Sequence, residues 1–303
     1  MGQGHSHAPP DSRRRLAVVL ALTVTVLIVE VVGAVVSGSL ALLADAAHML
    51  TDVAGLSMAL VVAAIVRRPP SDTHTWGLRR AEVLGAAAQA TLLLAVGGFV
   101  LVEAVRRLDE PAEVTGSAML VFGVVGLLGN VVGMTILAAG GREHHDLNMR
   151  AAYLEVVADA LGSVAVIVAA VLVATTGWER ADPVASLVIV ALIVPRTLHL
   201  LRETTHVLLE ATPRGLALAD VRARLLAHDH VREVHDLHVS SVATGLPTLT
   251  AHLVVDDSCF HDGHLATLLD QLQAALADDF DVAHSTLQFE RAGHAAHEHD
   301  LHP

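Results

Sequence analysis

Residues 44–52 read Ala-Asp-Ala-Ala-His-Met-Leu-Thr-Asp and lie inside an apolar run that extends from about 39 to 66. His48 and Asp52 stand four residues apart, so a helix places both side chains on one face, one turn apart. An imidazole and a carboxylate at this spacing can bind one divalent cation. Ionisable side chains are costly at membrane depth, which favours a function over a polar pair that only packs helices together. Asp45 is a candidate accessory acid, with a helix-start or packing role as the alternative.

A second apolar stretch, at 150–164, carries Glu155 and Asp159 at the same spacing of four residues. Two helices that each offer two ligands can form one four-coordinate cation site, and packing alone explains such a coincidence poorly. The two stretches therefore predict a transport site that consists of His48, Asp52, Glu155 and Asp159.

The composition is that of an integral membrane protein. Of the 303 residues, 53% are hydrophobic, and the mean hydropathy is +0.56; soluble chains of this length are rarely so apolar. Most of the net charge of −13 comes from the last third of the chain, which argues against nucleic acid as a partner. Cys259 is the one cysteine, so an intrachain disulfide and a thiolate-rich metal site are excluded.

Six apolar runs predict six membrane-spanning helices, at about 15–36, 39–66, 81–107, 116–139, 149–175 and 182–203. In the fourth run, Gly129 and Gly133 form a small-xxx-small pair that favours close helix contact. Arginines concentrate on the N-terminal side of the membrane, so the positive-inside rule places both termini in the cytoplasm. We expect a multi-pass protein of the cell membrane, with residues 1–14 as a disordered, His-containing N-terminus and 15–207 as a six-helix bundle.

The sequence pattern changes near residue 208, where Pro213 and Gly215 indicate a linker. The elements predicted beyond it are a helix at 217–229, strands at 233–241 and 247–256, an amphipathic helix at 261–279 and a strand at 283–290. The predicted fold class is therefore an all-α membrane bundle followed by a soluble α+β domain of αββαβ order over 208–291. Residues 292–303 form a His-rich tail that we expect to be disordered.

These features together resemble the cation diffusion facilitator family, whose members exchange divalent metal cations for protons. The resemblance covers nearly the whole chain: the six spans, the two ligand pairs, Thr75-Trp76-Gly77, Arg80-Ala81-Glu82, Asp182-Pro183 and Val234-His235-Asp236-Leu237-His238. It implies a homodimer with a metallochaperone-like cytoplasmic domain. It also implies that a divalent cation is the substrate and a possible regulatory ligand, with no separate cofactor.

Glu155 departs from the family pattern, because zinc-transporting relatives usually have histidine at this position. The site here has one nitrogen and three carboxylate ligands, which zinc accepts in tetrahedral geometry. An oxygen-rich site discriminates less against manganese, iron(II) and cobalt, although the Irving–Williams order still favours zinc over these three. We expect zinc, with manganese, iron(II), cobalt or cadmium as alternatives.

The resemblance also suggests secondary metal sites. Asp72 and His74, between the second and third spans, partly match a family loop site, and a solvated loop is the alternative. His235 and His252 match positions at which family members bind regulatory metal across a dimer. The remaining candidates in this domain are Glu290 as a plausible ligand, Gln288 as a poor one, and His261 and His264 as possible contributors.

We expect the cation to bind from the cytoplasm when the four ligands are deprotonated, and protons to displace it on the other side, because both compete for the same atoms. His48 is the expected coupling residue, since imidazole titrates nearest neutral pH. A membrane-anchored metal sensor is the alternative from another class, but an anchor does not need four ionisable ligands. An enzyme is not expected, because the spans lack a nucleophile–base set and a fully protein-ligated metal leaves no open position for water.

Overall fold

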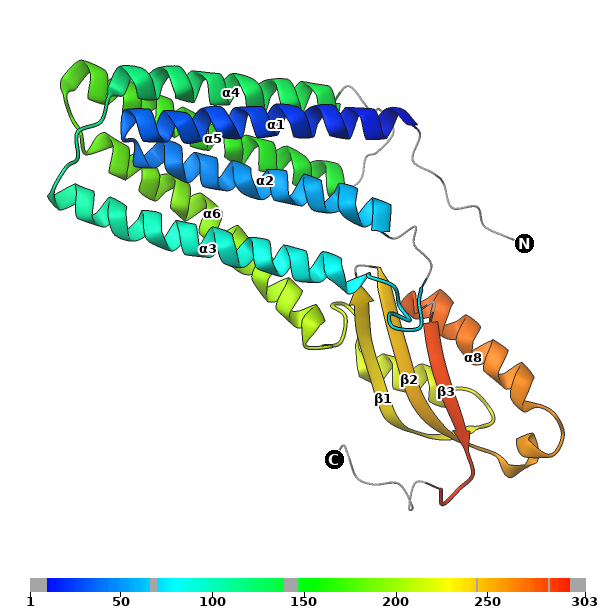
Figure 1. The fold of residues 1–303 in the computed structure, drawn as a ribbon. Helices are drawn as coiled ribbons and strands as arrows, with labels where there is room; N and C mark the ends of the chain where they lie inside the picture. The colour runs from blue at the N-terminus through cyan, green and yellow to red at the C-terminus, as the bar shows by residue number, and fades with distance from the viewer. Residues whose placement is uncertain (1–9, 66–69, 139–146, 244, 283, 295–303) are drawn as a thin grey trace. The chain divides into compact units, whose positions relative to one another are not determined.

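The computed structural model describes residues 10–65, 70–138, 147–243, 245–282 and 284–294 (Figure 1), although several helical side chains within 10–19, 52–65, 134–138 and 147–159 fall outside the description. The chain forms two compact units. One consists of Met1–Ala64 and Gly85–Leu201, and the other of Ile65–Leu84 and Arg202–Pro303. The loop that joins the second and third helices therefore belongs with the C-terminal unit.

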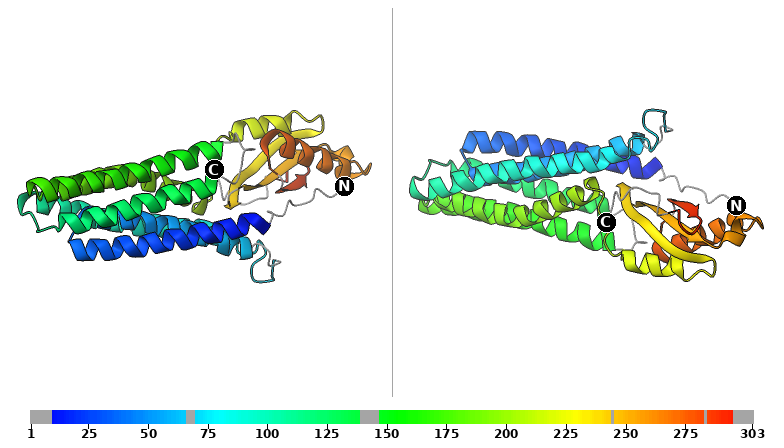
Figure 2. Two further views of the ribbon diagram at one scale, coloured as in Figure 1. Left: turned by 90° about the horizontal axis from the view of Figure 1, so that it is seen from above. Right: turned by 90° about the horizontal axis from the view of Figure 1, so that it is seen from below.

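Six helices form the first unit and run roughly along one direction in each view (Figures 1 and 2). Their bounds are α1 (Pro10–Ser37), α2 (Leu40–Ile65), α3 (Arg80–Asp109), α4 (Gly116–Ala138), α5 (Leu147–Thr176) and α6 (Ala181–Leu208). Four helices contain described segments long and apolar enough to cross a membrane, namely α1, α3, α4 and α6. The described apolar segments of α2 and α5 are shorter, Leu40–Thr51 and Ala160–Thr176.

Two helix ends differ from the prediction. α1 begins at Pro10, so residues 10–14 are helical rather than disordered. Proline suits a first helical position, because the amide hydrogen that it lacks would have no partner inside the helix there. α6 continues to Leu208 instead of ending near 203. The other residues of the predicted flexible N-terminus, 1–9, and most of the tail, 295–303, lie outside the described residues.

Glycines of α4 allow close approach to its neighbours. A Cβ at Gly126 would collide with the Glu30 carboxylate of α1, and one at Gly129 would collide with Val26. At Gly133 a Cβ would only reach ordinary contact with Leu22, at 3.9 Å. Small residues at such a crossing let backbones approach. The α1–α4 contact therefore uses Gly126 and Gly129 rather than the predicted pair of Gly129 and Gly133.

Among the described side chains, the buried core of the bundle lies toward the end that carries its three short connections, residues 38–39, 110–115 and 177–180, which we call the short-loop end. Its core joins the first half of α2 to parts of the other helices. The largest fully buried side chains there are Leu42, Met119, Val166, Ile189 and Val100.

The C-terminal domain contains α7 (Leu218–Leu226), β1 (Val231–Ala243), β2 (Leu246–Val255), a 3₁₀ turn (Asp257–Phe260), α8 (Leu265–Phe280) and β3 (His284–Glu290). This is the predicted αββαβ order. The sheet order is β1-β2-β3, with β2 antiparallel to β1 and parallel to β3. The helix predicted from 261 begins only at Leu265, because the 3₁₀ turn and Gly263, at φ +78°, interrupt the helical path.

One face of the sheet packs against α7 and α8. Val221 and Leu225 of α7 and Leu268, Leu272 and Leu276 of α8 form one core with alternate residues of the strands. Side chains alternate across a strand, so the other face carries His235, His252 and Gln288, which the pairing register places side by side.

Candidate functional site

The predicted transport site lies on α2 and α5. α2 is helical across His48 and Asp52, and α5 is helical across Glu155 and Asp159, so each pair is one helical turn apart along its backbone. The side chains of Asp52, Glu155 and Asp159 lie outside the described residues. The four-ligand site therefore stays a prediction.

His48 lines a small cavity of about 30 Å³ between α2, α5 and α6. A space of this size can hold a water molecule or a single ion. The lining residues are Asp45, His48, Gly162, Ile189, Leu192, Ile193 and Arg196. The cavity is thus polar on the α2 side and mostly apolar on the α6 side.

Asp45 shares this cavity with His48 and is only 3% exposed. Its Oδ2 accepts a hydrogen bond from Ser163 Oγ of α5 at 3.2 Å. Gly162 lets α5 approach, since a Cβ there would lie 3.3 Å from Asp45 Oδ1. The helix-start role is wrong, because α2 begins at Leu40. Asp45 instead joins α2 to α5 beside His48, which is a packing contact; its role as an accessory acid stays a prediction.

Arg196 is a cavity residue that was not among the predicted site residues. It follows Pro195 inside α6 and brings a permanent positive charge to the cavity that holds Asp45 and His48. The available signal was a charged residue inside an apolar span, which by itself suggests a function.

The loop candidates Asp72 and His74 belong to a tight turn. Ser71 and His74 form an isolated β-bridge, and the His74 amide donates to Ser71 Oγ at 3.2 Å. His74 Nδ1 lies 3.1 Å from Thr73 Oγ1, and Asp72 and His74 are exposed. Where the structure is described, these two residues are not part of a three-ligand group.

The C-terminal domain brings together three of the predicted ligands. Atoms of His235, His252 and Glu290 that could bind a metal all lie within 4.8 Å of one another. His235 Nε2 is 3.1 Å from Glu290 Oε2, and His252 Nδ1 is 2.9 Å from Glu290 Oε1. Glu290 is buried and both imidazoles are partly buried. Two imidazoles and a carboxylate form a donor set that zinc accepts.

Neighbouring side chains orient this cluster. Gln288 Nε2 donates to Glu290 Oε1 at 2.7 Å, so Gln288 supports the carboxylate rather than acting as a ligand. Asp236, at φ +47° in an irregular part of β1, places Oδ2 3.8 Å from His252 Nε2. The motif at 234–238 did not predict this position of Asp236, because a β-bulge that redirects a side chain has no simple sequence signal.

The structure does not bring His261 or His264 into this group within one chain. His261 is exposed and follows the 3₁₀ turn, on the path toward α8. His264 instead stacks edge-on against His230, with ring centroids 4.7 Å apart.

The loop between α2 and α3 contacts the C-terminal domain within the second unit. The Trp76 ring lies edge-on to His284, the first residue of β3, with centroids 4.8 Å apart. Arg80, the first residue of α3, pairs with Glu210 at 2.7 Å.

Family models match almost the entire chain. The cation efflux transmembrane domain matches residues 16–209, and the cytoplasmic domain of cation efflux proteins matches 213–292. A solved structure of the metal-bound C-terminal domain of the CzcD transporter from Cupriavidus metallidurans is 37% identical and covers 25% of this chain and 99% of that chain, with a TM-score of 0.23.

Full-length relatives agree with these matches. The metal cation efflux system protein CzcD of Cupriavidus metallidurans is 43% identical over 96% of this chain and 91% of its own length. The zinc transporter ZitB of Escherichia coli is 40% identical over 94% and 90%. A cadmium, cobalt and zinc/H(+)-K(+) antiporter of Bacillus velezensis is 33% identical over 99% and 94%. With both of its domains matched, this chain belongs to the cation efflux family of membrane transporters, the cation diffusion facilitators.

Proposed function

We propose that this protein exports divalent metal cations from the cytoplasm in exchange for protons, with zinc as the preferred cation. The observation that carries the proposal is the family match over the transmembrane domain, together with the small cavity that His48 and Asp45 line between α2, α5 and α6. The printed names of relatives, a zinc transporter and a cadmium, cobalt and zinc antiporter, support both the cation class and an exchange mechanism.

The transport site consists of His48, Asp52, Glu155 and Asp159. One imidazole and three carboxylates carry three negative charges when deprotonated, which favours a divalent cation over a monovalent one. Proton uptake by the same groups releases the cation, because a protonated ligand cannot coordinate. Both termini lie in the cytoplasm, as the arginine distribution indicates. The short-loop end of the bundle then faces away from the cytoplasm.

The cluster of His235, His252 and Glu290 is a regulatory metal site in the C-terminal domain. Its support is the close approach of the three ligand atoms on a sheet face that the helices leave open. The chain acts as a homodimer, and His261 of a second copy completes the coordination.

Purified full-length protein in proteoliposomes with a pH dye inside tests the transport function. Zinc, cobalt, cadmium, manganese and iron(II) are added in turn to the wild type, His48→Ala and Asp159→Ala. We expect zinc to drive proton flux in the wild type and both variants to lose it. Glu110→Ala serves as a matched control, since this exposed acid follows α3 in a short connection. Zinc-driven proton flux that persists in both His48→Ala and Asp159→Ala would contradict the proposed site.

A Glu155→His variant tests the cation preference. If zinc drives flux in the wild type and the variant only sharpens selectivity, the three-carboxylate site is a zinc site. If manganese or iron(II) drives flux and the variant shifts the response to zinc, zinc is the wrong substrate. Metal binding without any flux would instead favour a membrane-anchored sensor.

A further inference from the structure

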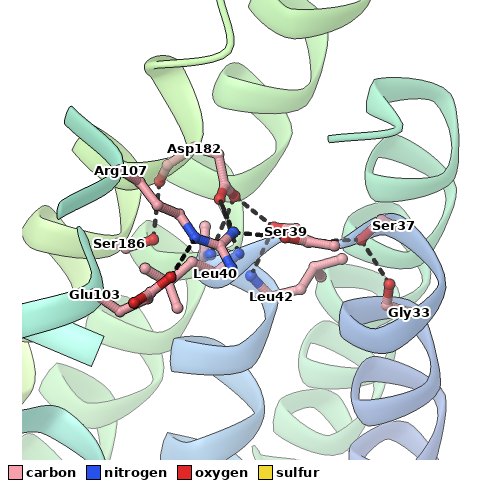
Figure 3. Close-up of polar contacts among 11 residues, drawn as sticks. Gly33, Ser37, Ser39, Leu40, Leu42, Glu103, Arg107, Asp182 and Ser186 are labelled. Carbon is pink, nitrogen blue, oxygen red and sulfur yellow. Dashed lines mark hydrogen bonds and ion pairs between the residues drawn. The ribbon is translucent and has the colours of Figure 1, made fainter. Parts of the chain in front are cut away.

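Asp182 is a fully buried carboxylate in the first turn of α6, and its contacts are all at the short-loop end of the bundle (Figure 3). Its Oδ1 accepts hydrogen bonds from Ser39 Oγ at 2.5 Å and from the Ala41 amide at 3.1 Å. Its Oδ2 accepts from the Leu40 amide at 2.8 Å. A buried carboxylate is tolerated only when such partners replace its lost hydration.

The three donors are the N-terminal cap and first turn of α2. Ser39 precedes the helix and accepts from the Leu42 amide at 3.1 Å, in the manner of an ordinary N-cap. The Leu40 and Ala41 amides would have no partner inside α2, because the first N–H groups of a helix point out of its end. Asp182 satisfies both, and its negative charge faces the positive end of the α2 dipole. α6 therefore supplies part of the cap of α2.

A third helix joins the same contact. Arg107 of α3 donates to the Gly38 carbonyl at 2.8 Å and lies 3.9 Å from Asp182 Oδ2. Its Nε also donates to Glu103 Oε1 at 3.0 Å (Figure 3). The turn before α2, the start of α6 and the end of α3 are thus held together by one set of polar contacts.

The two helices that Asp182 joins are also the walls of the cavity beside His48. His48 lies eight residues beyond Leu40, about 12 Å along α2. Ile189, Leu192 and Ile193 line the cavity from α6, two to three turns beyond Asp182. Leu42 of α2 and Ile189, which lines the cavity from α6, are both fully buried in one core, so a shift of α2 at its capped end is transmitted to His48 through packed side chains.

We infer that Asp182 is a positioning residue for cation transport, because its carboxylate fixes the register in which α2 presents His48 against α6. The inference rests on the proposed function of His48. A carboxylate is required, because two oxygens accept from three donors. An asparagine would turn an N–H group toward a backbone N–H and lose the charge.

This role is tested in the full-length protein with the variant Asp182→Asn and the matched control Asp109→Asn. The measurements are zinc-driven proton flux and zinc binding. Asp109 is an exposed acid at the same end of the bundle. Asp182 acts on His48 from about 12 Å away along α2, and a displacement of about 1 Å caused by a distant substitution can cost on the order of 100-fold. We expect Asp182→Asn to raise the zinc KM and Kd by about tenfold or more, and Asp109→Asn to leave both unchanged. An unchanged KM in Asp182→Asn would overturn the inference.

The double variant Ser39→Asp, Asp182→Asn separates positioning from simple helix capping. An aspartate at 39 can cap α2 from within its own chain segment, but it cannot hold α2 to α6. We expect it to restore the thermal stability lost in Asp182→Asn without restoring the zinc affinity. Recovery of both properties would show that Asp182 only stabilises α2.

Two further variants distinguish a failure of the positioning role from a failure of the proposed function. If Asp182→Asn does not fold, Ser39→Ala removes one of the three hydrogen bonds to Asp182, together with the cap bond from the Leu42 amide, and is expected to raise the zinc KM severalfold; a wild-type KM would contradict the positioning role. His48→Ala is measured in the same series. Flux retained in His48→Ala would refute the proposed function itself, whereas flux lost there with a wild-type KM in Asp182→Asn would refute only the positioning role.

Discussion

At the scale of single residues, Glu290 shows how one buried carboxylate organises a candidate metal site. Its two oxygens face His235 and His252, and Gln288 donates to one of them. Ligand atoms of the three candidate residues lie within 4.8 Å of one another, so little reorganisation of this arrangement opposes metal binding.

Replacing Glu290 with glutamine should therefore weaken zinc binding by the C-terminal domain at least about tenfold, since a side-chain amide cannot supply the charged oxygen that a carboxylate ligand offers to zinc. Isothermal titration in a His48→Ala background, which disables the proposed transport site, measures this binding separately. His294→Ala is the control, because this exposed residue lies beyond β3. Equal zinc affinity in Glu290→Gln and the control would contradict the assignment.

A second residue-scale prediction concerns acid stability. The hydrogen bond from Arg232 holds the pKa of Asp256 below its usual value of 3.8, with a smaller contribution from His230. Because the folded-state pKa is lowered, the stabilisation is present above 3.8 and is lost as the pH falls through the lower folded pKa. Thermal unfolding of the full-length protein should show Asp256→Asn less stable than wild type near neutral pH, with the two converging in acid. A gap that widens in acid would contradict this.

At the scale of elements, the α1–α4 crossing depends on the absence of a side chain at Gly126. The Glu30 carboxylate, which is fully buried, occupies the space that a Cβ would need. We expect Gly126→Ala to destabilise the bundle by about 1–3 kcal/mol, the usual effect of overpacking.

Gly98→Ala is the matched control for that substitution, because a Cβ at Gly98 meets nothing within 4 Å. Alanine is the better helix former by about 1 kcal/mol, so the control should be neutral or stabilising. Unfolding of both variants in detergent provides the comparison. A loss of stability at Gly98 equal to that at Gly126 would show that helix packing is not the cause.

The elements themselves were largely predictable from hydropathy and periodicity, since each of the eleven predicted helices and strands appears within a few residues of its expected position. The misses have local causes: Pro10 starts α1 early, and Gly263 delays α8. Contacts between distant residues were not predictable. Asp182 caps a helix that begins 142 residues away in the sequence, and Asp45 accepts a hydrogen bond from Ser163, 118 residues away. No local sequence pattern predicts either pairing.

At the scale of the whole molecule, β3 connects two features of the C-terminal unit. Its last residue, Glu290, belongs to the candidate metal cluster of His235, His252 and Glu290, and its first residue, His284, contacts Trp76 in the loop that leads from α2 to α3. A cation bound at one end of this strand can therefore influence the loop that follows the helix carrying His48.

This connection predicts that Trp76 and Glu290 act on transport in a coupled way. In a double-mutant cycle on zinc-driven flux, Glu290→Gln should change the rate in the wild-type background and have no further effect in a Trp76→Ala background, because independent sites add and sites in one pathway do not. The ring contact itself contributes about 0.5–1.5 kcal/mol, so Trp76→Ala should leave the protein folded. Leu78→Ala is the loop control, since Leu78 is also exposed and apolar. The effects of Leu78→Ala and Glu290→Gln on the rate should simply add. If the effects of Trp76→Ala and Glu290→Gln also add, the loop does not transmit the state of the candidate metal cluster to the membrane domain.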